Sequence, residues 1–271
     1  MSRRLCEKPV QGGTVMIKEL GLQLYTIRDF MKNEDDIRES FQKMRKYGYT
    51  QAQTANCAIP YADFGRIARE EGIQIIGTHD SFDRMVNNFA LSLEQHKLLG
   101  TTNMGIGSFR YHTQDDVKAF IDQANMVGEK AAQNGMKFTY HHHSYEFFRW
   151  SDGRTTMDML VEGLDPNNVS FVLDTYWVQH GGGDIRYWIE KLQGRIDIMH
   201  LKDMKRINPQ EHVNAHQYAE VGSGNLNWDL ILEAAEKNGV KYYVVEQDGG
   251  YAVNCFQSIK SSADYLRRYM K

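Results

Sequence analysis

The hydrophobic pattern of the chain repeats from residue 17 to the C-terminus. A segment with apolar residues at helical spacing ends in a glycine, and a short apolar run follows almost at once. Glycine is common just beyond the C-terminus of a helix, so each of these glycines predicts a helix that leads into a strand. The glycines with this pattern are Gly48, Gly72, Gly100, Gly135, Gly194 and Gly239.

Two more apolar runs, at residues 21–26 and 169–177, complete a set of eight predicted strands, each followed by a helical pattern. Strands that alternate with helices predict a parallel sheet with right-handed crossovers. Eight such units over roughly 250 residues match a closed (β/α)8 barrel. We therefore predict an α/β fold, a single TIM barrel over residues 17–271, preceded by a loose lead-in over residues 1–16.

A doubly wound sheet is the alternative to the barrel. That fold places a glycine-rich phosphate loop after its first strand, where this chain has YTIRD at residues 25–29. The glycine triplet at residues 181–183 has neither the GxGxxG nor the GxxxxGKS/T spacing of a phosphate-binding loop, and we interpret it as a flexible loop. The pattern favours the barrel.

Composition and charge narrow the classes of partner. A formal charge of −3 offers no basic patch for nucleic acid, and no segment approaches the roughly 20 apolar residues of a membrane span. The three cysteines are scattered and odd in number, which argues against a disulfide framework or a cysteine-based zinc site. We predict a cytoplasmic protein with a small-molecule partner; assembly into a homo-oligomer is compatible with the sequence.

Active sites of TIM barrels gather at the C-terminal ends of the strands, where this chain carries many carboxylates and imidazoles. A lone carboxylate at such a position is commonly a helix N-cap, and a lone histidine is commonly a core residue. Here, however, Asp174, His200 and Glu246 each occupy the first polar position after at least three apolar residues. Such a mixed oxygen and nitrogen set suits Mn²⁺, Mg²⁺, Co²⁺ or Zn²⁺.

Several motifs in order carry a family resemblance. They are GLQLYT at 21–26, YHHHSYEF at 140–147, LDTYW at 173–177, MHLKD at 199–203, EVGSGNLNW at 220–228 and VVEQD at 244–248. The chain resembles the sugar phosphate isomerase/epimerase group of the xylose isomerase-like superfamily, which includes tagatose 3-epimerase and inosose dehydratase relatives. The resemblance implies a divalent metal, Mn²⁺ first, held by Glu146, Asp174, His200 and Glu246.

The ligand from the fifth strand has two candidates within this resemblance. Counted from Gly135, His141 stands where the epimerases place their first glutamate, whereas members with a YHNH motif provide the later glutamate, Glu146 here. We assign Glu146 to the metal, and we expect His141 and His143 to bind substrate or to act as acid and base.

The resemblance also implies the chemistry. A metal-polarised carbonyl of a sugar, sugar phosphate or cyclitol would lose a neighbouring proton to give an enediolate, with Glu146 and Glu246 as acid/base groups on opposite faces. This reaction makes the protein an isomerase or epimerase. A histidine in place of one carboxylate would instead favour β-elimination, so a lyase of the inosose dehydratase or keto-glycoside type is the alternative.

Other residues receive supporting roles. We predict substrate contacts from His79, Lys202, Gln23 and Trp177, and we interpret residues 205–221, which include His212 and His216, as a mobile lid. Two other classes remain in view: a non-catalytic sugar-binding barrel, and a phosphodiester-cleaving relative of endonuclease IV. The second needs more histidine and aspartate ligands and a more basic surface than this chain provides.

Overall fold

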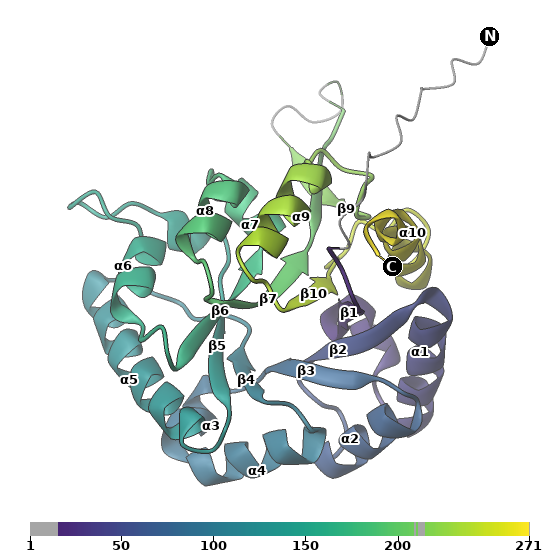
Figure 1. Cartoon of the computed structure of the whole chain (residues 1–271), viewed down its shortest axis with the longest axis horizontal. Coiled ribbons are helices and arrows are strands. Elements are labelled where there is room, and N and C mark those ends of the chain that lie inside the picture. The colour runs from purple at the N-terminus through teal and green to yellow at the C-terminus, as the bar shows by residue number, and fades with distance from the viewer. Residues whose placement is uncertain (1–15, 209, 211–214, 271) are drawn as a thin grey trace.

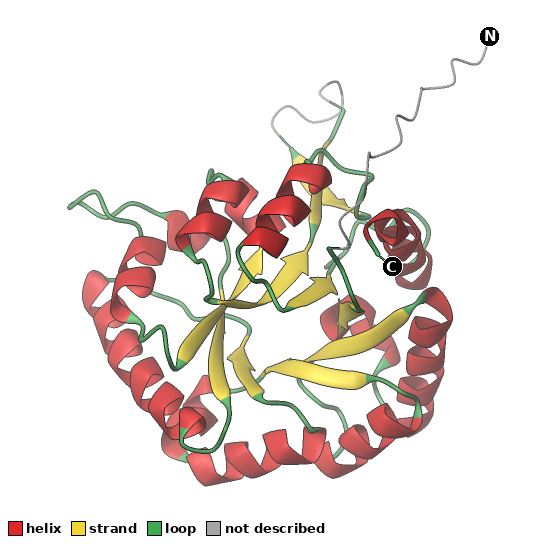
Figure 2. Cartoon of the chain, in the orientation of Figure 1, coloured by secondary structure: helices red, strands yellow, loops and turns green. Residues whose placement is uncertain are grey.

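The computed structural model describes residues 16–208, 210 and 215–270. Eight parallel strands form one sheet that curves into a nearly closed barrel, and the helices surround it (Figures 1 and 2). The predicted single TIM barrel is confirmed. Of the predicted lead-in, residues 1–15 lie outside the described residues. In the described part of the chain, no helix combines the length and apolarity needed to cross a bilayer.

The barrel strands follow an order that matches βα units wound around a circle. In sheet order they are β3 (Gln74–His79), β2 (Tyr49–Ala55), β1 (Leu20–Gln23), β10 (Tyr242–Val245), β7 (Ile196–Leu201), β6 (Val169–Asp174), β5 (Lys137–His141) and β4 (Asn103–Ile106). Between β3 and β4 the contact includes hydrogen bonds from Asn103 Nδ2 to the Ile76 carbonyl and from the Asp80 amide to the Gly105 carbonyl, each 2.8 Å long.

The helices cover the outer face of the sheet (Figure 2). They are α1 (Glu34–Tyr47), α2 (Tyr61–Glu70), α3 (Phe82–Asn87), α4 (Phe89–Leu99), α5 (Gln114–Ala132), α6 (Thr156–Gly163), α7 (Thr175–His180), α8 (Ile185–Lys191), α9 (Trp228–Lys237) and α10 (Cys255–Leu266), with 3-10 turns η1 (Leu24–Phe30), η2 (Tyr145–Phe147) and η3 (Arg267–Tyr269). The six glycines that predicted these boundaries all have positive φ, between 69° and 99°. Such angles favour glycine.

Two predicted strands end earlier than their apolar runs do. The first strand stops at Gln23, and the chain enters η1. The run at 169–177 stops at Asp174, because Asp174 Oδ1 accepts the backbone N–H of Trp177 (3.0 Å) and so caps α7. Trp177 therefore lies on a helix at the barrel mouth.

The segment predicted to be a mobile lid is largely a hairpin. Strand β8 (Asp203–Arg206) pairs antiparallel with β9 (His216–Ala219), and His216 lies opposite Arg206. His212 lies outside the described residues. At the base of the hairpin, the Asp203 carboxylate accepts the backbone N–H groups of Met204, Gly222, Gly224 and Leu226 and the indole N–H of Trp228. This carboxylate ties the hairpin to the start of α9.

The interior of the barrel places the polar residues of the site. A small apolar cluster inside the barrel consists of Ile76, Val172, Ile198 and Val244. Two positions beyond the last three of these residues stand Asp174, His200 and Glu246. Because side chains along a strand alternate between faces, these three point to the same interior, one layer nearer the C-terminal mouth. The apolar cluster is the floor on which the site is built.

Candidate metal centre

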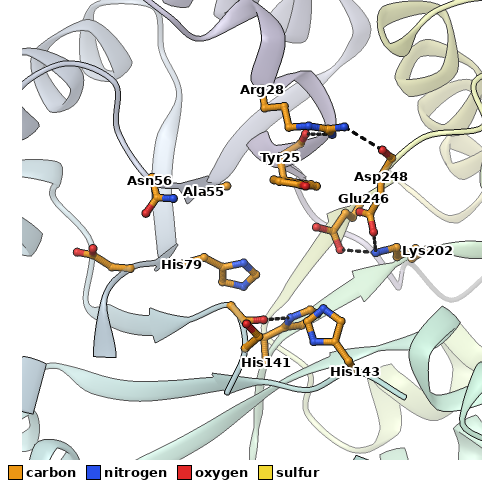
Figure 3. Close-up of a pocket in the computed structure, with 13 residues that line it drawn as sticks. Tyr25, Arg28, Ala55, Asn56, His79, His141, His143, Lys202, Glu246 and Asp248 are labelled. Atoms are coloured by element: carbon orange, nitrogen blue, oxygen red, sulfur yellow. Dashed lines mark hydrogen bonds and ion pairs between the residues drawn. The ribbon is translucent and has the colours of Figure 1, made fainter. Parts of the chain in front are cut away.

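Four buried side chains meet above the apolar floor. His141, Asp174, His200 and Glu246 each offer one ligand atom, and these atoms all lie within 4.8 Å of one another. They come from the ends of four adjacent strands, β5, β6, β7 and β10. His141 and Glu246 also line a pocket of about 590 Å³ at the barrel mouth (Figure 3).

The ring of His141 has a defined tautomer. Its Nδ1 lies 2.8 Å from the carbonyl oxygen of Gly107, which can only accept, so Nδ1 carries the proton. The lone pair is therefore on Nε2, which lies 3.5 Å from Asp174 Oδ2. A backbone carbonyl that orients a histidine in this way is typical of the surroundings of a metal-bound imidazole.

His200 is oriented by the opposite nitrogen. Its Nε2 lies 2.6 Å from the amide oxygen of Gln53 and donates to it. Its Nδ1 lies 2.9 Å from Glu246 Oε2 and 3.5 Å from Asp174 Oδ2, and among the described residues this buried atom has no well-aligned hydrogen-bond partner. Two imidazole nitrogens and two carboxylates thus surround one place, and such a set fits a divalent cation.

The ionisable groups of the centre shift one another's pKa values. Burial by itself would lower the pKa of His200, but Glu246 and Asp174 raise it to about 9. Burial would raise the pKa of each carboxylate, yet Lys202 and the histidines hold the pKa of Asp174 and of Glu246 well below the ordinary range. Both carboxylates are therefore ionised at neutral pH, as metal ligands must be.

Lys202 is a buried counter-ion. Its ammonium group lies 3.1 Å from Glu246 Oε2 and 2.8 Å from Asp248 Oδ2 (Figure 3). The same group lies 3.7 Å from Asp174 Oδ2. Three aromatic rings approach the same ammonium group, those of Tyr176, Trp177 and Tyr218. Lys202 lines the pocket, so it can still reach a substrate.

Glu146 occupies a different position from the one the sequence suggested. It lies on η2, where its Oε1 accepts from the Tyr140 hydroxyl (2.5 Å) and its Oε2 from the His143 backbone N–H (2.9 Å). Burial raises its pKa to about 7. Glu146 belongs neither to the four-residue group nor to the pocket lining. The structure groups His141, and not Glu146, with the other three ligand candidates. His141 still lies on the regular strand, whereas the chain has left β5 before residue 146.

The remaining predicted residues divide into pocket wall and support. His79 and His143 line the pocket. Burial and the neighbouring His141 lower the pKa of His143 to about 2, so its ring is neutral. Trp177 packs against His143 with ring centroids 5.0 Å apart, and Gln23 is fully buried and bonds His79. Trp177 and Gln23 thus contact residues that line the pocket and do not line it themselves.

Sequence reasoning missed two features of the site. Gln53 is a strand-interior glutamine that binds His200, although 147 positions separate the two residues in the chain. At the rim, the Arg28 guanidinium stacks 4.2 Å from the centroid of the Tyr25 ring and donates to the Asp248 carbonyl (3.3 Å). Polar residues inside predicted strands were the available signal for Gln53.

Comparisons with known proteins agree with this architecture. The sequence profile of the family described as "Xylose isomerase-like TIM barrel" matches residues 17–269. The chain belongs to this family. Among curated relatives, an inosose dehydratase from Geobacillus thermodenitrificans is 28% identical over 167 residues, a segment that covers 57% of this chain and 55% of that protein. The match thus spans about half of the relative's length.

Solved structures share the fold of this family member. A sugar phosphate isomerase/epimerase from Parabacteroides distasonis superposes with a TM-score of 0.81 at 22% identity, covering 98% of this chain and 99% of the other. The IolI protein, solved with a bound zinc atom, superposes with a TM-score of 0.69 at 14% identity, covering 93% and 98% of the two chains. At these identities the likeness establishes the fold.

Proposed function

We propose that this protein is a divalent-metal-dependent enzyme that removes a proton from the carbon next to a carbonyl group in a sugar or cyclitol. The observation that carries the proposal is the group of His141, Asp174, His200 and Glu246, which offers two imidazole lone pairs and two carboxylates at a pocket. The family assignment supports it. The donor set accommodates Mn²⁺, the first candidate from the sequence, and equally Co²⁺ or Zn²⁺, the ion of the IolI structure.

A bound divalent cation would supply Lewis-acid polarisation of the substrate carbonyl and so acidify the neighbouring C–H. Glu246 is the proposed base, because it is ionised and lines the pocket. Lys202 keeps Glu246 ionised and orients its Oε2. His143, a neutral ring that lines the same pocket, is the second proton carrier that we propose in place of Glu146, which is not among the residues that line the pocket.

Isomerisation or epimerisation is the first reaction type we propose. Transfer of a proton between adjacent carbons on one face requires one base, and Glu246 meets this requirement. Inversion at one carbon requires a second group on the other face of the sugar. We assign this role to His143, whose neutral ring would give its N–H proton to the carbon while its other nitrogen takes a proton from solvent. Both reactions use the same first step.

A lyase reaction is the second candidate, and one observation favours it. Glu246 is the one glutamate of the four-residue group, which has His141 at the end of the fifth strand. His143, on the pocket wall beside His141, would protonate a departing oxygen after the C–H bond has broken and take a solvent proton at its other ring nitrogen. The similarity to inosose dehydratases supports this variant as well.

Solvent-exchange NMR tests the proposal. The protein, loaded with Mn²⁺, Co²⁺ or Zn²⁺ in turn, would be incubated in D₂O with ketoses, inososes and 3-keto-glycosides, and the metal would be removed before spectra are recorded. We expect deuterium at a carbon next to the carbonyl, with a new sugar isomer for an isomerase or an unsaturated ketone for a lyase.

The control for this experiment separates the site from the fold. Glu246→Gln should abolish both exchange and turnover, whereas Glu233→Gln on the exposed surface of α9 should retain them. Substrate binding without metal uptake by the wild type would favour the non-catalytic sugar-binding barrel.

A further inference from the structure

A series of hydrogen bonds crosses the barrel interior beneath the pocket. A backbone N–H group at one end determines which atom donates in each of these bonds. The amide N–H of Tyr25, which can only donate, lies 3.1 Å from one terminal atom of the Gln23 side chain, so that atom is the oxygen Oε1. The other terminal atom is therefore Nε2. Its two hydrogens point to Gln53 Oε1 (3.0 Å) and to His79 Nδ1 (3.2 Å).

This series of hydrogen bonds determines the tautomer of His79. Because Nδ1 of His79 accepts from Gln23, the ring proton must be on Nε2. That Nε2 is a buried atom with no hydrogen-bond partner in the described part of the chain, and the ring lines the pocket. The ring packs closely against Gly107, where an added Cβ would come within 2.9 Å of its Nδ1.

The same series of hydrogen bonds determines the tautomer of His200. Gln53 Oε1 receives a hydrogen from Gln23 Nε2 and another from His200 Nε2. The reversed Gln53 amide would set its NH₂ group against the NH₂ group of Gln23 and is excluded by this geometry. The atom that faces His200 Nε2 is therefore an oxygen, and His200 Nε2 must donate to it. With its proton on Nε2, His200 keeps its Nδ1 lone pair for the centre formed with Asp174 and Glu246.

We propose that Gln23 and Gln53 form a tautomer relay, in which one backbone N–H sets His200 as an Nδ1 metal ligand and sets His79 as a neutral Nε2–H donor to a substrate oxygen. Gln23 and Gln53 are positioning residues. The substrate part rests on the proposed function: the His79 N–H is placed to bind the carbonyl oxygen as negative charge develops on it, and preorganised donors of this kind stabilise an oxyanion. The metal part requires no substrate.

Nitrogen NMR of the imidazole rings tests the relay directly in the wild type. Two-bond ¹H–¹⁵N spectra of ¹⁵N-histidine-labelled protein, with and without Zn²⁺, distinguish a protonated from an unprotonated ring nitrogen. Signals are assigned by their loss in His79→Asn and His200→Asn. We expect His79 to be protonated only on Nε2 in both samples, and His200 to be protonated only on Nε2 once Zn²⁺ is bound. A proton on Nδ1 of either ring in the Zn²⁺ sample overturns the proposal.

Metal affinity tests the positioning role of Gln53 without any activity assay. Loss of a group that orients a metal-bound histidine typically costs about 10–100-fold in metal affinity, so Gln53→Met should weaken Zn²⁺ and Co²⁺ binding by that factor in competition with a chromophoric chelator. Gln53→Glu keeps an acceptor for His200 and should restore most of the affinity.

The matched control lies on the same strand. Gln51 is also buried on β2 and makes two side-chain hydrogen bonds, to Glu19 and Gln74, outside the site. Gln51→Met should leave metal affinity within about twofold of the wild type. Equal affinities for the wild type, Gln53→Met and Gln51→Met would overturn the role of Gln53, and melting curves followed by circular dichroism verify that each variant is folded.

The bond from Gln23 to His79 is tested by a separate variant. Gln23→Met removes the donor to His79 Nδ1, and we expect the His79 nitrogens to shift toward values averaged over two exchanging tautomers. An unchanged single Nε2–H form would exclude Gln23 as the residue that sets it. If the relay is verified but no substrate exchanges deuterium, the proposed function fails while the organisation of the metal centre stands.

Discussion

The Nδ1 atom of His200 lies 2.9 Å from Oε2 of Glu246, while the other ring nitrogen donates to Gln53. A lone pair that faces a carboxylate at this distance is unfavourable unless positive charge lies between them. A proton provides that charge when His200 is protonated, and a divalent cation provides it more strongly. The contact therefore marks the place where metal binding and the protonation of the site are linked.

The identity of the fifth-strand ligand can be decided by two substitutions. We expect His141→Ala to weaken Zn²⁺ and Mn²⁺ binding by more than about 100-fold, because it removes a donor rather than a group that orients one. Glu146→Gln should retain metal affinity within a fewfold of the wild type, since both Glu146 oxygens bind Tyr140 and His143 instead. Chelator competition measures both. Loss of binding in Glu146→Gln alone would restore Glu146 as the ligand.

We predict that Lys202 stabilises the metal-free protein by neutralising buried carboxylates. Its substitution by methionine keeps an apolar stem beside Trp177 but leaves Glu246, Asp248 and Asp174 without their buried cation. Breaking a buried pair by removal of one partner costs about 3–5 kcal/mol, so the free energy of unfolding of metal-free Lys202→Met should fall by that amount.

A divalent ion should reverse much of the Lys202→Met effect. We expect saturating Zn²⁺ to raise the melting temperature of this variant more than that of the wild type, measured by circular dichroism. Lys237→Met removes an exposed lysine paired with Glu233 on α9 and serves as the control, with a change below about 1 kcal/mol. Equal responses of the wild type and Lys202→Met to Zn²⁺ would contradict the counter-ion role.

Glu146 gives the stability a distinct pH dependence. In the folded protein its pKa is raised to about 7, against 4.5 for an ordinary glutamate, so between these pH values the folded state holds a proton that the unfolded chain has lost. The contribution of Glu146 to the free energy of unfolding is therefore fully present below about pH 4.5 and is lost as the pH rises through 7, by up to about 3 kcal/mol.

The comparison with Glu146→Gln isolates this contribution. Urea unfolding of both proteins at several pH values from 4 to 8 should give a difference, wild type minus variant, that decreases as the pH rises. Carboxylates other than Glu146 contribute equally to both proteins and cancel. Parallel stability curves would show that the pKa of Glu146 is the same in the folded protein as in the unfolded chain, and would contradict this prediction.

Asp203 is predicted to support stability rather than metal binding. Its carboxylate accepts from four backbone N–H groups and the indole of Trp228, and Asp203→Ala leaves these donors without their partner. Each unsatisfied buried donor costs about 1–3 kcal/mol, so we expect a loss of at least about 3 kcal/mol in urea unfolding. Asp264→Ala, which removes surface ion pairs of α10, should cost less than about 1 kcal/mol. Similar losses in both variants would contradict the role of Asp203.

The barrel and three of the four metal-binding candidates follow from local patterns along the sequence. Glycines that require positive φ divided the chain into repeated units, and those units left few topologies open. Asp174, His200 and Glu246 could be found because each follows an apolar strand that is buried, and alternation along that strand fixes the face on which the next polar side chain lies. These rules are local, because each prediction uses only residues within a few positions of the residue that it concerns.

The choice of a fourth candidate and the hydrogen-bonded network around the centre depend on how the chain folds. Which of His141 and Glu146 lies beside the other three candidates depends on where β5 ends. Glu146 lies beyond that end and accepts a hydrogen bond from Tyr140. The contact between Gln53 and His200 exists because the barrel closes and brings β2 and β7 across a common interior. Periodicity specifies a face of a strand, whereas the partner that a side chain meets across the barrel is set by how the strands are packed around the axis.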